Sequence, residues 1–135
     1  MPPGRSLFGT LLLGSDDPPV ETAFRNPSPS LGLSVDVVTR GGQLIRYLLS
    51  NRYDLVALDL TLPGIPGAAL VEVVHRLAPD ALLLVVAPEE SLALETWVRE
   101  GGAFYFLVKP VEEEEVALVL HDALSFLLRG KRGSS

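Results

Sequence analysis

Five short apolar segments alternate with segments of helical spacing along the chain. We expect strands at residues 7–14, 33–38, 55–60, 81–86 and 104–108. The third and fourth segments are apolar at nearly every position, which is typical of strands covered by helices on both faces of a parallel sheet. The alternation therefore predicts a single α/β domain with a doubly wound, five-stranded parallel sheet and right-handed crossovers.

The segments between these strands carry apolar residues three and four positions apart. Helices are expected at residues 43–50, 68–77 and 111–128, and one more follows Ser91. The Ser91 hydroxyl can cap that helix, and Gly101-Gly102 can end it.

The first helix is expected to be short. Pro18-Pro19 can open it, but Pro27 and Pro29 lie inside the span that a full-length helix would need. A proline within a helix costs about 3 kcal/mol, so this helix should stop near Arg25 and be followed by a turn or extended connection at residues 26–30.

The last helix is apolar on nearly every side. One face is expected to cover the sheet, whereas Leu118, Leu124, Phe126 and Leu128 are expected on other faces. A helix of this kind is normally buried all round, which suggests that a second subunit covers it.

Composition narrows the class of protein. The 135 residues correspond to one domain, expected at residues 6–128 with disordered ends at 1–5 and 129–135. Seventeen acidic residues against 11 basic ones argue against nucleic acid as a partner of this domain, because phosphate neutralisation needs clustered Lys and Arg. No cysteine is present, which excludes disulfides and thiol chemistry. No apolar run approaches the ~20 residues of a membrane span, so a cytoplasmic domain is expected.

Charged side chains follow the predicted strands at one edge of the sheet. Ser15, Asp16 and Asp17 come after the first strand, Asp59 ends the third, and Lys109 follows the fifth. Doubly wound sheets bind ligands at the carboxyl ends of their strands. Two carboxylates suit Mg²⁺, and a carboxylate beside a metal ion and a lysine can accept a phosphoryl group.

Two segments carry a family resemblance. In residues 53–67, Asp59 ends a strand, Pro63 follows four positions later and Gly67 eight positions later; residues 102–110 run from Gly-Ala to Lys109-Pro110. Together they resemble bacterial response-regulator receiver domains of the chemotaxis-regulator type, over residues 6–128. The resemblance implies a flavodoxin-like (βα)5 fold with strand order 2-1-3-4-5.

The resemblance also implies roles for individual residues. Asp59 would accept a phosphoryl group from a histidine kinase, and Lys109 would contact that group. Asp16 and Asp59 would hold Mg²⁺ together with the backbone carbonyl of Thr61. The bond between Lys109 and Pro110 would be cis.

The acidic pair after the first strand departs from the family pattern. Receivers usually carry two adjacent acids there, and an alignment on Pro18 places Ser15 and Asp16 at those positions. Sliding the alignment by one residue restores the pair as Asp16-Asp17 but shortens the turn before the helix. We favour the first alignment, which predicts weak Mg²⁺ binding because one negative charge is missing. Asp16 and Asp17 could instead simply cap the helix.

The switch positions depart as well. Ala87 stands where receivers normally have Ser or Thr, and a methyl group cannot donate a hydrogen bond to a phosphoryl oxygen. Pro88 restricts Ala87 to extended conformations. Phe106 stands at the aromatic switch position, where Tyr is common, and lacks its hydroxyl. Phosphorylation could survive these changes, but we do not expect its transmission to survive.

Three functional hypotheses follow. The first is a non-enzymatic, receiver-like domain that signals through protein contacts, with a histidine kinase or another signalling protein as partner. Receiver-like domains often pair through the fourth helix, fifth strand and fifth helix, so a homodimer through these elements is also expected. The second is a conventional Mg²⁺-dependent phosphoacceptor in a phosphorelay. The third, a small α/β enzyme or cofactor-binding protein, is disfavoured because the turn after the first strand holds carboxylates and prolines instead of a glycine-rich phosphate loop.

Overall fold

The computed structural model describes residues 9–133, with side chains to residue 130. Its strands are β1 (Gly9–Gly14), β2 (Leu33–Val38), β3 (Leu55–Asp59), β4 (Leu82–Ala87) and β5 (Tyr105–Val108). Neighbouring strands are parallel, and their order is β2-β1-β3-β4-β5. The predicted flavodoxin-like sheet is therefore confirmed.

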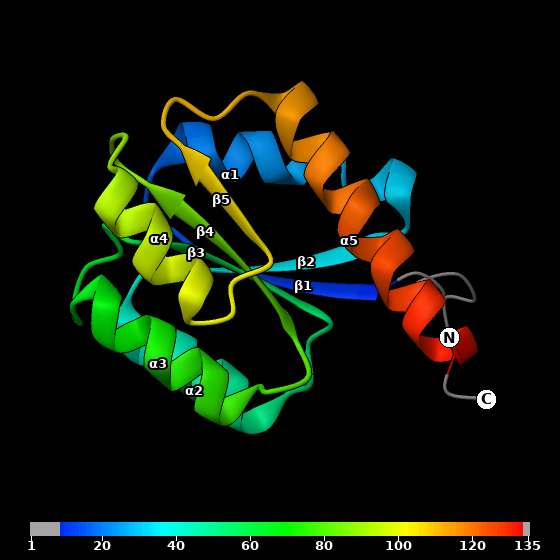
Figure 1. Cartoon of the computed structure of the whole chain (residues 1–135), viewed down its shortest axis with the longest axis horizontal. Helices are drawn as coiled ribbons and strands as arrows, with labels where there is room; N and C mark the ends of the chain where they lie inside the picture. The colour runs from blue at the N-terminus through cyan, green and yellow to red at the C-terminus, as the bar shows by residue number, and fades with distance from the viewer. Residues whose placement is uncertain (1–8, 134–135) are drawn as a thin grey trace.

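Helices cover both faces of this sheet. They are α1 (Pro18–Arg25), α2 (Gly41–Ser50), α3 (Gly67–Leu77), α4 (Leu92–Glu100) and α5 (Glu113–Gly133). Helices α1 and α5 pack on one face, and α2, α3 and α4 on the other (Figure 1). Within residues 9–133, no helix combines the length and apolar character that a membrane span requires.

The two apolar cores follow from the period of two along each strand. In β1, Leu11 and Leu13 are buried beneath α1 and α5, whereas Leu12 is buried beneath the other three helices. Both faces of β3 are fully buried, because this strand lies in the centre of the sheet. This burial explains the nearly continuous apolar run at its position.

The short first helix is confirmed. Helix α1 ends at Arg25, residues 26–28 form a turn, and Pro29 opens a 3-10 turn that ends at Leu31. The Ser28 hydroxyl donates a hydrogen bond to the Phe24 carbonyl at 2.6 Å, which satisfies a carbonyl near the helix end.

Two expectations for the last helix were wrong. Leu124 is buried against the sheet instead of lying on an outer face. The helix also continues to Gly133, so residues 129–133, expected in a disordered tail, are helical. Exposed helical turns satisfy their own backbone hydrogen bonds, so an apolar pattern does not mark where such a helix ends. The expectations for residues 1–5 and 134–135, and the first two residues of the strand expected at 7–14, fall outside the described residues.

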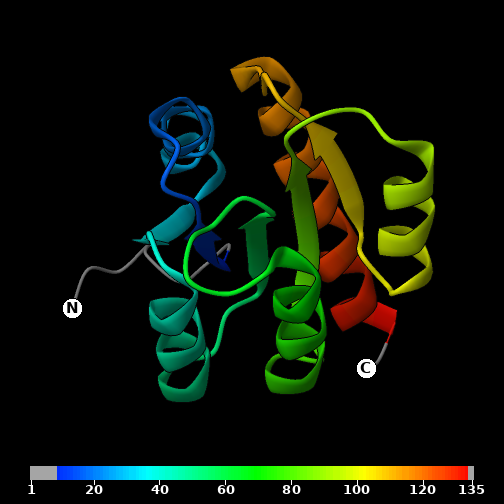
Figure 2. The ribbon, with the colours of Figure 1, turned by 90° about the vertical axis from the view of Figure 1, so that its left-hand side faces the viewer.

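The parallel arrangement brings the carboxyl ends of the strands to one edge. The arrowheads of β3, β4 and β5 point toward the same end of the molecule (Figure 2). The segments that follow the strands therefore meet there, which is where the sequence places its charged side chains.

Candidate functional site

Strand register places Ser15 beside Asp59. The last residue of β1, Gly14, pairs with Leu58 of β3, so the next residues of the two strands are neighbours at the edge of the sheet. On the other side, Asp59 pairs with Val86 of β4. Residues after β1 and β3 thus meet in one acidic notch.

The Asp59 carboxylate is the centre of the site. Asp59 has 0% exposed surface, and its two oxygens accept four hydrogen bonds. Oδ1 accepts from the Thr61 amide at 3.0 Å and from the Thr61 hydroxyl at 2.7 Å. Oδ2 accepts from the Ser15 hydroxyl at 2.7 Å and from the Lys109 ammonium at 2.9 Å. A carboxylate offers about four lone-pair positions, so the protein itself occupies all of them.

Lys109 joins both acidic segments. Its ammonium lies 2.9 Å from Asp17 Oδ2 as well as from Asp59 Oδ2, and it donates to the Thr61 hydroxyl at 3.2 Å. The Lys109 amide donates to the Ala87 carbonyl at 2.9 Å, which fixes this residue next to the end of β4. The Lys109–Pro110 peptide bond is cis, in agreement with the family resemblance.

These contacts set the protonation states of the site. Burial raises the pKa of Asp59, but the hydrogen bonds from Thr61, Lys109 and Ser15 outweigh burial and hold that pKa below its ordinary value. For Lys109, burial lowers the pKa, whereas the bonds to Asp17 and Asp59 raise it, and the net shift is upward. At neutral pH the site therefore contains an ionised carboxylate in contact with an ammonium group.

The two aspartates after Ser15 take different positions. Asp17 is the residue before α1 but makes no capping bond with its side chain, which instead pairs with Lys109. The Asp16 side chain is exposed, and its carboxylate makes no hydrogen bond or ion pair within the described part of the chain. The structure thus brings Asp17 into the site and leaves Asp16 beside it. Sequence reasoning assigned Asp17 a lesser role. The available signal was its spacing of two residues from Ser15, because residues two apart on an extended segment point the same way.

The arrangement does not fit a metal ion as it stands. Every acceptor position of Asp59 is occupied by a protein donor, and the ammonium of Lys109 lies against Oδ2. Thr61 contacts Asp59 through its amide and hydroxyl. Among the described residues, no group of three or more His, Cys, Asp or Glu side chains could hold an ion. A cation at Asp59 would have to displace one of these donors.

The two residues that the resemblance places at switch positions are apolar and buried. Ala87 has 0% exposed surface, and Phe106 has 8%. Both belong to the core beneath α2, α3 and α4. Neither side chain can hydrogen-bond to a group bound at Asp59.

The loop after β3 depends on Gly67. A Cβ atom at this position would lie 2.7 Å from the Leu60 carbonyl oxygen, which is closer than real Cβ atoms come. Only glycine therefore allows α3 to begin directly against the end of β3. The glycine of the family motif holds the chain close to Asp59.

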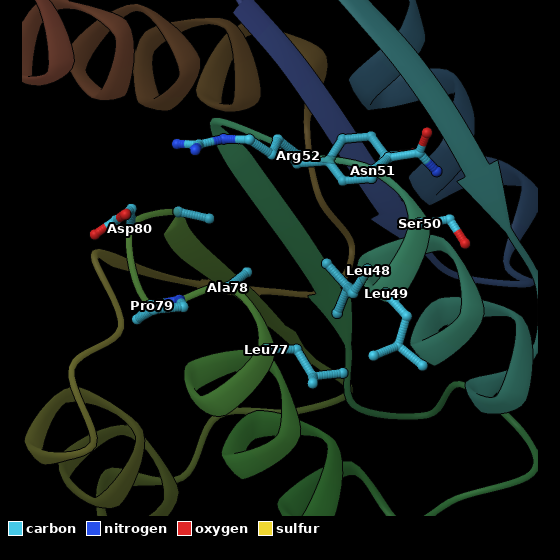
Figure 3. Close-up of a pocket in the computed structure, with 11 residues that line it drawn as sticks. Leu48, Leu49, Ser50, Asn51, Arg52, Leu77, Ala78, Pro79 and Asp80 are labelled. Atoms are coloured by element: carbon cyan, nitrogen blue, oxygen red, sulfur yellow. The ribbon is translucent and has the colours of Figure 1, made fainter.

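A separate hollow opens at the opposite edge of the sheet. It has a volume of about 390 Å³ and lies between the segments that lead into β3 and β4 (Figure 3). Leu48, Leu49 and Leu77 line it together with Arg52 and Asp80. It lies at the amino ends of the strands, away from the notch at Asp59.

The fold and the site define a family. The family model of the response regulator receiver domain matches residues 11–121, so the chain belongs to that family. Receiver domains of two-component systems are in general non-enzymatic signalling domains, interact with histidine kinases and typically bind Mg²⁺ at their phosphorylation site.

Particular relatives are distant. The chain is 27% identical over 116 residues to the DNA-binding transcriptional regulator NtrC of Azospirillum brasilense, covering 86% of this chain and 24% of that protein. It is 28% identical over 114 residues to the transcriptional regulatory protein GlrR of Escherichia coli, covering 84% and 26%. The chain thus spans about a quarter of the length of these relatives. A CheY-like receiver domain protein of Methanospirillum hungatei has the same fold, with a TM-score of 0.80 and 21% identity over 90% of this chain and 97% of that one.

Proposed function

We propose that this receiver domain signals mainly through protein–protein contacts, with a weak or absent response to phosphorylation at Asp59. The observation that carries the proposal is Ala87, a fully buried methyl group at the position where a hydroxyl would sense a phosphoryl group. The four hydrogen bonds that already hold Asp59 support it, because a phosphoryl donor must first free a carboxylate oxygen.

Asp59 remains the candidate phosphoacceptor. In a transfer step, an Asp59 oxygen would bond to phosphorus while the bond from phosphorus to the donor nitrogen or oxygen breaks with its electron pair. Lys109, 2.9 Å from Oδ2, is placed to balance the added negative charge. This contact is what favours the second candidate function, a conventional phosphoacceptor supplied by a histidine kinase. In that case Asp16, Asp59 and the Thr61 carbonyl would be the Mg²⁺ ligands. Their affinity for Mg²⁺ would be low, because the ion would have to displace a protein donor from Asp59.

The partner is proposed to be a histidine kinase or another signalling protein. The relative from Azospirillum brasilense is named as a DNA-binding regulator, but the net charge of −6 argues against DNA contact by this domain itself. A homodimer through α4, β5 and α5 is part of the proposal. It is supported by Phe126 of α5, which is 47% exposed and packs on Phe104 beside β5 with ring centroids 5.4 Å apart.

The test is phosphorylation by a small phosphodonor. The protein is incubated with acetyl phosphate and Mg²⁺ and its intact mass is followed over time, with Asp59→Asn as the control for the site. We expect little or no gain of a phosphoryl group in the wild-type protein. A stoichiometric gain that Asp59→Asn abolishes would overturn the weak-response proposal and establish the conventional phosphoacceptor.

A further inference from the structure

Four residues at the site form a closed ring of polar contacts. The Ser15 hydroxyl donates to Asp59 Oδ2 at 2.7 Å, and the Lys109 ammonium lies 2.9 Å from the same oxygen. Lys109 also lies 2.9 Å from Asp17 Oδ2, and the Asp17 amide donates back to the Ser15 hydroxyl oxygen at 3.1 Å. The ring ties the start of α1 to the ends of β3 and β5.

The ring fixes the direction of the Ser15 proton. The Ser15 oxygen accepts a hydrogen bond from the Asp17 amide, and an ionised carboxylate can only accept. The hydroxyl hydrogen must therefore point at Asp59 Oδ2. Ser15 is 1% exposed, so water does not compete for this bond.

We propose that Ser15 is a positioning residue that takes the place of a divalent cation at Asp59. Its hydroxyl holds the carboxylate and, with Lys109, fills the oxygen that a cation would bind. The Ser15 hydroxyl would then lower cation affinity in two ways: it lacks the charge of an acidic ligand, and it competes with the cation for Asp59. The inference rests on the proposed function, in which Asp59 is the candidate phosphoacceptor, and describes how that site is held when no phosphoryl group is bound.

Substitutions at Ser15 separate competition from simple loss of a ligand. Ser15→Ala and Ser15→Gly both remove the hydroxyl without adding charge, Ser15→Thr keeps it, and Ser15→Asp restores an acid. Ser28→Ala is a matched control, because Ser28 is also 1% exposed and, among the residues that the structure describes, its hydroxyl bonds only to the Phe24 carbonyl. Mg²⁺ is titrated into each folded protein and binding is followed by backbone amide chemical shifts, with thermal melting as the check on folding.

Competition predicts that the hydroxyl-free variants bind Mg²⁺ about tenfold more tightly than the wild type, since a hydrogen bond to a charged group is worth about that factor. Ser15→Thr and Ser28→Ala should bind Mg²⁺ as the wild type does, and Ser15→Asp should bind it most tightly. If Ser15→Ala and Ser15→Gly bind Mg²⁺ no better than the wild type, the proposal is overturned. Ser15 then weakens Mg²⁺ binding only because it lacks the carboxylate of an acidic residue.

This titration is independent of the phosphodonor experiment. Tighter Mg²⁺ binding by Ser15→Ala supports the ring whether or not Asp59 then accepts a phosphoryl group. Efficient phosphorylation of the wild-type protein would contradict the proposed function and leave the titration result standing. The two failures are therefore distinguishable.

Discussion

At the scale of single residues, the properties of the site depend on the hydrogen-bond donors that stabilise the buried charge of Asp59. A buried carboxylate without partners would have a raised pKa and would destabilise the fold. Here Thr61, Ser15 and Lys109 supply all four donors, so the ionised form is favoured. The same donors that make Asp59 stable also make it less available to an incoming phosphorus atom.

The lowered pKa of Asp59 predicts a loss of stability in acid. Its pKa is lower in the folded chain than in the unfolded chain, so the stabilisation is present above the unfolded value of about 3.9 and is lost as pH falls through the folded value. Urea unfolding between neutral pH and about pH 3 should show this loss in the wild-type protein. Asp59→Asn should be less stable at neutral pH and show a shallower decline in acid. Parallel declines of the two proteins would contradict the argument.

At the scale of elements, local signals predicted most of the structure. The prolines after Arg25 limited α1, and the apolar runs located the strands most clearly at β3 and β4, which are buried on both faces. The end of α5 was missed, since exposed turns leave no apolar pattern. Leu124 was misplaced because the sheet-facing stripe of α5 is wider than the one assumed.

The cap of α4 offers a test at this scale. The Ser91 hydroxyl accepts a hydrogen bond from the Leu94 amide at 3.1 Å. Ser91→Ala should lower the free energy of unfolding by about 1 kcal/mol, measured by urea denaturation, because an amide at the helix start loses its partner. Ser125→Ala within α5 is the control, where alanine's helix propensity should leave stability unchanged or slightly higher. Equal effects of both changes would argue against the cap.

The site was only partly predictable from the sequence. The meeting of Asp59 with Lys109 follows from strand order, since both residues stand at carboxyl ends of strands in one parallel sheet. The individual bonds of Ser15 and Asp17 could not be derived, because they depend on side-chain rotamers in the three residues between β1 and α1. The family alignment on Pro18 therefore favoured Asp16, whereas the geometry favours Asp17 as the partner of Lys109.

At the scale of the whole molecule, the two faces of the sheet have different surroundings. The α2, α3 and α4 side contains both switch positions within its core. On the other side, α5 reaches the edge at β5, where Phe126 and Phe104 leave aromatic surface partly uncovered. A partner that buries this aromatic pair would contact the edge of the sheet next to α4.

The proposed homodimer makes a prediction at this scale. Sedimentation at micromolar concentration should show a dimer in the wild-type protein, and Phe126→Asp should shift it to monomer because a charge would be buried at the interface. Leu49→Asp is the matched control, since Leu49 is 66% exposed on α2, outside α4, β5 and α5, and its change should not alter the mass. A wild-type protein that sediments only as monomer would rule out this dimer.

We propose that binding of a ligand at Asp59 does not change the conformation of α4. The reason is that neither Ala87 nor Phe106, which would lie between the two, can form a hydrogen bond with the ligand. Trp97, the single tryptophan of the chain, lies on α4 with 41% exposure and reports on that helix. The measurement is Trp97 fluorescence during titration with beryllofluoride and Mg²⁺, with Ala87→Thr beside the wild type. We predict unchanged emission in the wild-type protein and a saturable change in Ala87→Thr. A saturable change of equal size in the wild-type protein would contradict the account.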